Sequence, residues 1–272
     1  MTPRRIALLG AGNMGRALLG GLLRSGARPE WLTVGESLPA ARAQLQRELG
    51  VSASADNLAA VAEAQLVILA VKPDQGAAVL APLRAALARN RPVLLSVLAG
   101  VRSRQLVQWC GAGVPVVRAM PNRPALLNAG ITGLYAPPQV AAPARTLAEE
   151  VMRAVGETVW VEAEDALDAV TALSGSGPAY CFLLAECMAE AGERLGLTHE
   201  AAQRLARATL HGAGVMAQAP GADLAQLRAE VTSAGGTTAA ALAVLEGSDL
   251  RGALARALAA AAARSRELAG RT

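Results

Sequence analysis

The sequence predicts an α/β chain in which an N-terminal doubly wound (Rossmann) parallel sheet is followed by an all-helical C-terminal half. Three observations lead to this prediction. Short apolar runs alternate with helical patterns over residues 1–161, as in a parallel sheet with crossover helices. A Gly-x-Gly-x-x-Gly motif joins the first apolar run to the first helical pattern. From residue 164 onward the spacing is helical and no strand is predicted. We therefore expect two domains, residues 1–161 and residues 162–272.

The composition argues against several classes of protein. The 272 residues are enough for two cores, but only 2% are aromatic, so Ala, Leu and Val fill the interior. The net charge of +4 comes from scattered Arg side chains without stacking aromatics, which argues against nucleic-acid binding. Three cysteines without a Cys-x-x-Cys pair predict neither a metal site nor a disulfide framework. No signal peptide and no apolar run of about 18 residues are found, so a cytoplasmic protein without a membrane partner is expected.

The first strand and its turn form the clearest binding motif. Residues 5–9 are a short apolar run, and Gly10-Ala11-Gly12-Asn13-Met14-Gly15 leads from it into a helical pattern. Gly10 is expected to make the tight turn, Gly12 to let the backbone approach a pyrophosphate, and Gly15 to let helix and strand pack closely. This context predicts a dinucleotide cofactor.

The end of the second strand, residues 32–34, bears on which dinucleotide is bound. Glu36 would accept hydrogen bonds from an adenosine ribose 2′-hydroxyl, which favours NAD. Ser37 would instead suit a 2′-phosphate, and Arg42 follows within reach. These signals conflict, and the choice between NAD and NADP stays open.

Further strands complete the predicted sheet. They are a short strand at Val51 and runs over residues 65–70, 93–96, 114–119, 131–135 and 158–161, with a helix over 139–155 before the last. Pro73 stops the run at 65–70 and places Lys72, the only lysine, at the ligand-binding edge of the sheet. In a chain that otherwise uses Arg, this lysine indicates a need for a compact charge, unless it is an accident of sequence.

The helical half is predicted from its apolar periodicity. Its segments cover residues 167–173, 179–195, 200–217, 222–230, 237–246 and 249–268. The stretch 174–178 separates the first two, Gly196 is the expected C-cap, and Thr198 is the next N-cap. Residues 179–195 are apolar on more than one face, so we expect a homodimer through this half, alone or within a larger homo-oligomer.

One segment of the helical half has the composition of an anion site. Residues 231–238 place four hydroxyl side chains around the pair Gly235-Gly236. The glycines allow a sharp turn, and Thr237 or Thr238 is expected to cap the helix that follows. The unpaired N–H groups and positive dipole end of such a helix suit a small carboxylate.

These motifs together resemble the pyrroline-5-carboxylate reductase family along the whole chain. The family's order is matched by Gly10 to Met14, Ala70-Val71-Lys72-Pro73, Met120-Pro121-Asn122, Leu173 to Tyr180, and Val231 to Thr238. The departures are Arg123 where members usually have Thr, Ala234 where they often have Pro, and Gly35-Glu36-Ser37 where many carry an Arg for the 2′-phosphate.

The resemblance implies NAD(P)H-dependent reduction of 1-pyrroline-5-carboxylate to L-proline, the last step of proline biosynthesis. It implies substrate contacts at Glu164, Ser233, Gly236, Thr237 and Thr238, with the catalytic Thr238 hydroxyl bonded to the ring nitrogen of the imino acid. It implies cofactor contacts at Gly10, Ala11, Gly12, Asn13, Met14, Gly15, Ser37, Asn57, Ala70, Val71, Lys72, Pro73, Val97, Leu98 and Ala99. A protonated imine is already electrophilic, so positioning supplies most of the rate.

Two other functions compete with this one. A β-hydroxyacid dehydrogenase shares the sheet-plus-helices layout but needs a Lys or similar base on the long helix, and residues 179–195 contain no Lys. A cofactor-binding regulator without turnover is opposed by the intact segment 233–238. The sequence therefore favours an enzyme.

Overall fold

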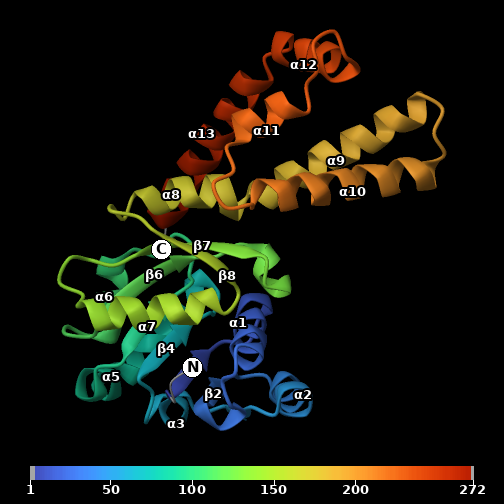
Figure 1. Cartoon of the computed structure of the whole chain (residues 1–272). Coiled ribbons are helices and arrows are strands. Elements are labelled where there is room, and N and C mark those ends of the chain that lie inside the picture. Colours follow the sequence, from blue (N-terminus) through green and yellow to red (C-terminus); the bar gives the residue numbers. More distant parts are fainter. Residues whose placement is uncertain (1–3, 271–272) are drawn as a thin grey trace. The chain divides into compact units, whose positions relative to one another are not determined.

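The computed structural model describes residues 4–270 and divides into two compact units (Figure 1). The first unit runs to Gly175 and also takes in the chain from Ala261 onward, and the second is Ser176–Ala260. The late segment joins the first unit through Ser265, whose hydroxyl donates a hydrogen bond of 2.6 Å to the buried carboxylate of Asp168. The domain boundary expected after residue 161 stays a prediction.

The first unit is built on one eight-stranded sheet with the order β3-β2-β1-β4-β5-β6-β7-β8. Because the order reverses between β1 and β4, the doubly wound arrangement expected from the sequence is confirmed. The strands are β1 (Ile6–Leu9), β2 (Leu32–Gly35), β3 (Ser52–Ser54), β4 (Leu66–Leu69), β5 (Val93–Ser96), β6 (Val116–Met120), β7 (Gly130–Tyr135) and β8 (Gly156–Trp160).

One pairing departs from the predicted all-parallel sheet. β7 runs antiparallel to β6, whereas the other pairings among the described strands are parallel. A parallel crossover needs about a dozen or more residues. Only residues 121–129, which include a short 3-10 turn at Arg123–Leu127, connect β6 to β7. The chain therefore returns as an antiparallel neighbour.

Alternate residues of each strand face opposite sides of the sheet, and each side has its own core. Ile6 and Leu8 lie in a core with α1 (Asn13–Arg24), α2 (Pro39–Leu49) and α7 (Ala142–Arg153). Ala7 and Leu9 lie in a second core with α3 (Asn57–Val61), α4 (Gly76–Leu80), α5 (Arg84–Asn90) and α6 (Ser103–Cys110). Burial on both faces explains why β1 and β4 read as unbroken apolar runs.

The segment from residue 164 to residue 270 contains helices and no strand, as predicted. α8 (Ala166–Val170) continues into a π-helical turn at Thr171–Gly175, and only Ser176 separates that turn from α9, so the predicted break is short. The remaining helices are α9 (Gly177–Arg194), α10 (His199–Ala217), α11 (Leu224–Glu230), α12 (Thr237–Gly247) and α13 (Leu250–Ala269).

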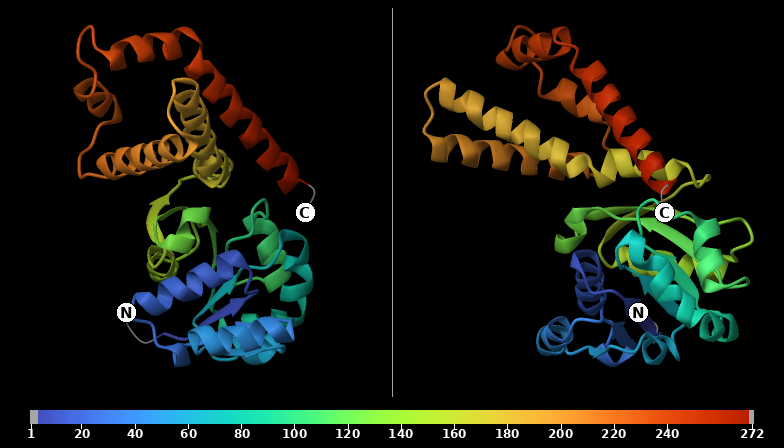
Figure 2. Two further views of the ribbon diagram at one scale, coloured as in Figure 1. Left: turned by 90° about the vertical axis from the view of Figure 1, so that its right-hand side faces the viewer. Right: turned by 180° about the vertical axis from the view of Figure 1, so that it is seen from behind.

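The turn between α9 and α10 follows its sequence signals closely. Leu195, rather than the predicted Gly196, is the C-cap of α9, and Gly196 follows it at a φ of 98°, which favours glycine. Thr198 caps α10 as predicted, because its hydroxyl accepts a hydrogen bond of 3.3 Å from the backbone N–H of Ala201. The two helices pack against each other as a hairpin, which the right-hand view of Figure 2 shows side by side.

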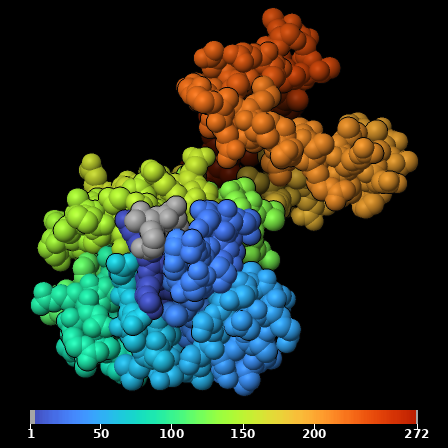
Figure 3. All heavy atoms as spheres, turned by 60° about the horizontal axis from the view of Figure 1, so that its bottom comes forward, coloured from blue at the N-terminus to red at the C-terminus, as the bar shows by residue number. Residues whose placement is uncertain are grey.

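The second unit has little interior of its own. The buried cluster of the α9–α10 hairpin consists of Ala189, Ala202 and Ala206. Large apolar side chains of the same helices are exposed, among them Phe182 at 63% and Leu183 at 59%. In Figure 3 no other helix of the second unit covers the visible face of the hairpin. Among residues 4–270, no helix has the length and apolar character to cross a membrane.

Candidate active site

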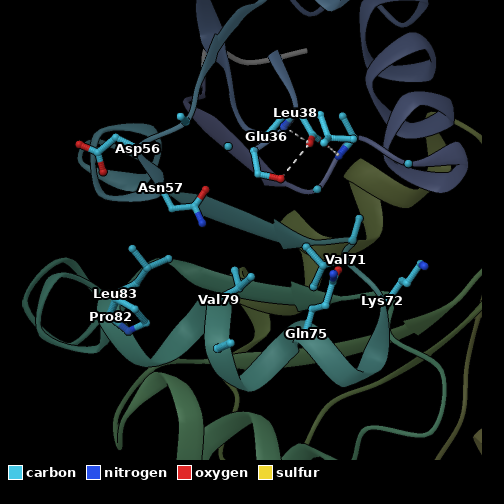
Figure 4. A pocket seen from close by; sticks show the side chains of 18 of the residues that line it. Glu36, Leu38, Asp56, Asn57, Val71, Lys72, Gln75, Val79, Pro82 and Leu83 are labelled. Atoms are coloured by element: carbon cyan, nitrogen blue, oxygen red, sulfur yellow. Dashed lines mark hydrogen bonds between the residues drawn. The ribbon is translucent and has the colours of Figure 1, made fainter. Parts of the chain in front are cut away.

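A cavity of about 920 Å³ opens at the carboxyl ends of β1, β2 and β4 (Figure 4). This is where the strand order reverses, the place at which doubly wound sheets bind their ligands. The predicted cofactor residues that line it are Gly10, Ala11, Gly12, Asn13, Met14, Ser37, Asn57, Ala70, Val71 and Lys72. The predicted residues outside the lining are Gly15, Pro73, Val97, Leu98 and Ala99.

The three glycines of the motif have three different surroundings. Gly10 has a φ of 92°, and a Cβ there would lie 2.9 Å from the backbone nitrogen of Val71. A Cβ on Gly15 would collide with the carbonyl oxygen of Gly10. A Cβ on Gly12 would meet no protein atom within 4 Å. Gly10 and Gly15 are therefore required by the fold, whereas Gly12 borders open space at the start of α1, and this cradle fits a pyrophosphate.

Hydrogen bonds of Glu36 link the loop after β1 to the loop after β2. Its Oε2 accepts a hydrogen bond of 3.0 Å from the backbone N–H of Ala11, and its Oε1 accepts one of 2.9 Å from Leu38. Arg42 is held nearby, because its Nη1 donates to the carbonyl oxygens of Glu36 at 2.8 Å and Ser37 at 2.7 Å. Arg42 does not line the cavity.

Two walls of the cavity were missed by the sequence analysis. The first follows β3 and includes Asp56 beside the predicted Asn57. Applying the strand-end rule to the short third strand would have found Asp56, since β3 lies next to β2 in the parallel sheet. The second wall comes from the turns after β4, with Gln75, Val79 and Leu83 among its residues. Nothing in that apolar stretch distinguishes it from an ordinary helix.

The predicted substrate residues fall in both units. Glu164 belongs to the first, where its Oε1 accepts hydrogen bonds from the backbone N–H of Ser103 at 2.6 Å and from Arg118 at 2.9 Å. Burial favours the neutral form of Glu164, but these two donors outweigh it and hold the pKa of its carboxyl below the usual value. Glu164 is therefore an anion in a fixed orientation at neutral pH.

The other predicted substrate residues gather at the start of α12 in the second unit. Gly235 has a φ of 68°, and the next residue approaches Ser233 so closely that a Cβ on Gly236 would collide with the Ser233 hydroxyl. Gly236 is the N-cap of α12, and no side chain caps this helix. The expected cap by Thr237 or Thr238 is therefore wrong, because both residues already lie inside the first helical turn. The first N–H groups of α12 are left without intrahelical partners.

Comparison with known proteins decides the family. Residues 164–268 match the family described as pyrroline-5-carboxylate reductase dimerisation, and residues 5–100 match the family of NADP oxidoreductases, coenzyme F420-dependent. A pyrroline-5-carboxylate reductase from Pseudomonas aeruginosa is 42% identical over 269 residues, which cover 99% of this chain and 98% of that protein. The chain belongs to the pyrroline-5-carboxylate reductase family.

Solved structures of this family share the fold. A pyrroline-5-carboxylate reductase from Coxiella burnetii superposes with a TM-score of 0.95 at 40% identity, covering 98% of this chain and 99% of that one. A Plasmodium falciparum pyrroline carboxylate reductase with NADP bound gives a TM-score of 0.84 at 25% identity, covering 99% of each chain. The expected family, fold class and NAD(P)-dependent oxidoreductase class are thus confirmed, whereas the residue assignments stay predictions.

Proposed function

We propose that this chain reduces 1-pyrroline-5-carboxylate to L-proline with NADH or NADPH, the last step of proline biosynthesis. The observation that carries the proposal is its similarity, over nearly its whole length, to reductases of that name. The cavity at the reversal of the sheet and the glycine-flanked start of α12 supply the two binding functions that the reaction needs.

The nucleotide cavity is proposed to hold the dinucleotide. The backbone from Gly10 to Met14 would bind the pyrophosphate at the start of α1, where N–H groups point outward and the helix dipole is positive. Lys72 adds a positive charge to the lining at the end of β4. When bound, the reduced nicotinamide supplies the hydride that adds to the imine carbon.

The start of α12 is proposed to hold the imino acid. The unpaired N–H groups of the first helical turn and the hydroxyl of Ser233 suit its carboxylate. The Thr238 hydroxyl would bond the ring nitrogen, which carries the proton of the iminium and keeps it as the secondary amine of proline. By family resemblance Glu164 contacts the substrate as well, and its ion pair with Arg118 keeps it ionised.

Steady-state reduction of 1-pyrroline-5-carboxylate by the purified protein tests the reaction. We expect loss of nicotinamide absorbance that depends on the imino acid, and formation of one proline for each cofactor oxidised. Oxidation of proline at high pH should give the reverse reaction. Protein with an intact thermal unfolding transition but no turnover with either cofactor would contradict the proposal and would favour a regulator.

We propose in addition that the protein is a cytoplasmic homodimer formed through its helical half. A hairpin with only three alanines in its buried cluster, and with Phe182 and Leu183 exposed, leaves too much apolar surface in water for a lone copy. A second copy of the same helices would cover that surface. The matched family domain is described by its dimerisation, which supports this partner.

Light scattering after size exclusion tests the dimer. We expect a mass of at least twice the 27.7 kDa chain. Phe182→Asp should lower the mass or the melting temperature, because it places a charge on the proposed interface. Leu127→Asp is the matched control, since Leu127 is 84% exposed on the first unit and should tolerate the charge. A wild-type protein at the mass of one chain would overturn the dimer.

A further inference from the structure

We propose that the adenosine end of the nucleotide cavity selects NADH over NADPH, and that Glu36 sets this preference. The inference rests on the proposed use of the cavity for the dinucleotide. It concerns the point that the sequence leaves open, where Glu36 favours one cofactor and Ser37 with Arg42 favours the other.

The hydrogen bonds of Glu36 fix its carboxylate at the end of β2. One oxygen is held by Ala11 and the other by Leu38, each through a backbone N–H, so neither oxygen can turn away without losing a bond. A carboxylate has about four acceptor positions, and these bonds together with a longer one of 3.5 Å from the Ser37 hydroxyl to Oε1 occupy three of them. The remaining position, on Oε2, matches a hydroxyl of an adenosine ribose, which is a donor. A 2′-phosphate offers only acceptors and carries about 1.5 to 2 negative charges at neutral pH.

The other charged side chains of the cavity do not offset the negative charge of Glu36. Among its described lining residues, the charged side chains are Glu36, Asp56 and Lys72. In Figure 4 Asp56 lies at one end of the view and Lys72 at the other, so the adenosine side after β2 and β3 carries only carboxylates. A phosphate bound there would lie close to negative charge in a partly enclosed site, where such charges are weakly screened.

Arg42, the cationic residue nearest to Glu36 in the sequence, bonds to the backbone of the loop and does not line the cavity. Its guanidinium donates to the carbonyl oxygens of Glu36 and Ser37 and stays outside the lining. It therefore supports the loop that presents the Glu36 carboxylate. Both bonds use Nη1, so moving the guanidinium into the cavity lining would give them up. The structure thus assigns Arg42 to positioning and Glu36 to cofactor selection.

Binding of NADH and NADPH, measured by nicotinamide fluorescence without imino acid, tests the proposal apart from turnover. We expect the Kd for NADH to be at least tenfold lower than the Kd for NADPH. Glu36→Gln removes the charge and, because its amide has a single acceptor oxygen, also one of the two backbone hydrogen bonds, so it should bring the two values to within about threefold. Ser37→Arg leaves Glu36 in place, adds a cation, and should tighten NADPH selectively.

Asp56→Asn is the matched control. It removes one charge from the same cavity and keeps the cap of α3, whose Leu58 N–H donates to Asp56 at 2.9 Å. Because Asp56→Asn removes a charge but no ribose ligand, it should shift the ratio of the two Kd values less than Glu36→Gln does and still leave NADH the tighter ligand. Equal or tighter binding of NADPH by the wild type, or an unchanged ratio in Glu36→Gln, would overturn the proposal while leaving the reductase function intact. Failure to bind either cofactor would overturn both.

Discussion

Replacing Gly12 by Val is expected to weaken NAD(P)H binding about a hundredfold and to leave the melting temperature nearly unchanged. A Cβ at this position meets no protein atom within 4 Å, and the backbone there is extended, with a φ of −69° and a ψ of −170°, which valine tolerates. The added methyl groups would instead occupy the space through which a pyrophosphate approaches the backbone. Losing one or two charge-assisted hydrogen bonds costs about 1.5–3 kcal/mol each, which corresponds to this effect.

Gly15→Ala provides the contrast that makes the Gly12 experiment decisive. Its Cβ would collide with the carbonyl oxygen of Gly10, so helix α1 and the turn must move apart. Overpacking of this kind destabilises by about 1–3 kcal/mol. Gly15→Ala should therefore lower the melting temperature, whereas Gly12→Val should change only the cofactor Kd measured by titration. A Gly12→Val protein that binds the cofactor normally would show that this turn does not hold the pyrophosphate.

The sheet was predictable because its signals are local. Runs such as residues 66–69 are buried on both faces, so their apolar character alone identifies them as strands. The glycine motif identified the first turn for the same reason, since a φ of 92° at Gly10 and the contact of Gly15 with it permit no side chain. The antiparallel β7 was not predictable by composition, and only the short connection over residues 121–129 contained the information.

The limits of prediction are clearest at the candidate site. Glu36 could be read from the sequence as a ribose ligand, but the positions of its partners could not. Whether Arg42 reached the cavity or the loop carbonyls depended on the turn between β2 and α2. The start of α12 was found, yet Thr237 or Thr238 was expected at the N-cap, whereas both lie inside the helix. A hydroxyl beside a glycine pair suits either position, so the sequence alone did not separate them.

Thr238→Val is expected to lower kcat/KM for 1-pyrroline-5-carboxylate ten- to hundredfold, and Thr238→Ser should recover much of the loss. The Thr238 hydroxyl is proposed to accept a hydrogen bond from the ring N–H of the iminium, and this bond favours the protonated, electrophilic form of the substrate to which hydride adds. A charge-assisted bond of about 1.5–3 kcal/mol gives an effect of that size. Valine keeps the branched shape of threonine, so the change removes the hydroxyl and little else.

If Thr238 only capped the helix, the variants would be expected to behave differently. The geometry of α12 argues against that capping role. A capping hydroxyl would cost about 1 kcal/mol of stability when removed. The N-cap is Gly236, so no such loss is expected from Thr238→Val. Thr232→Val is the matched control, because the Thr232 hydroxyl donates a hydrogen bond of 2.6 Å to the carbonyl oxygen of Arg228 within the same segment. It should lower the melting temperature and leave kcat/KM nearly unchanged. If Thr238→Val instead behaved like Thr232→Val, losing stability without losing rate, Thr238 would belong to the scaffold and the ring nitrogen would need another partner.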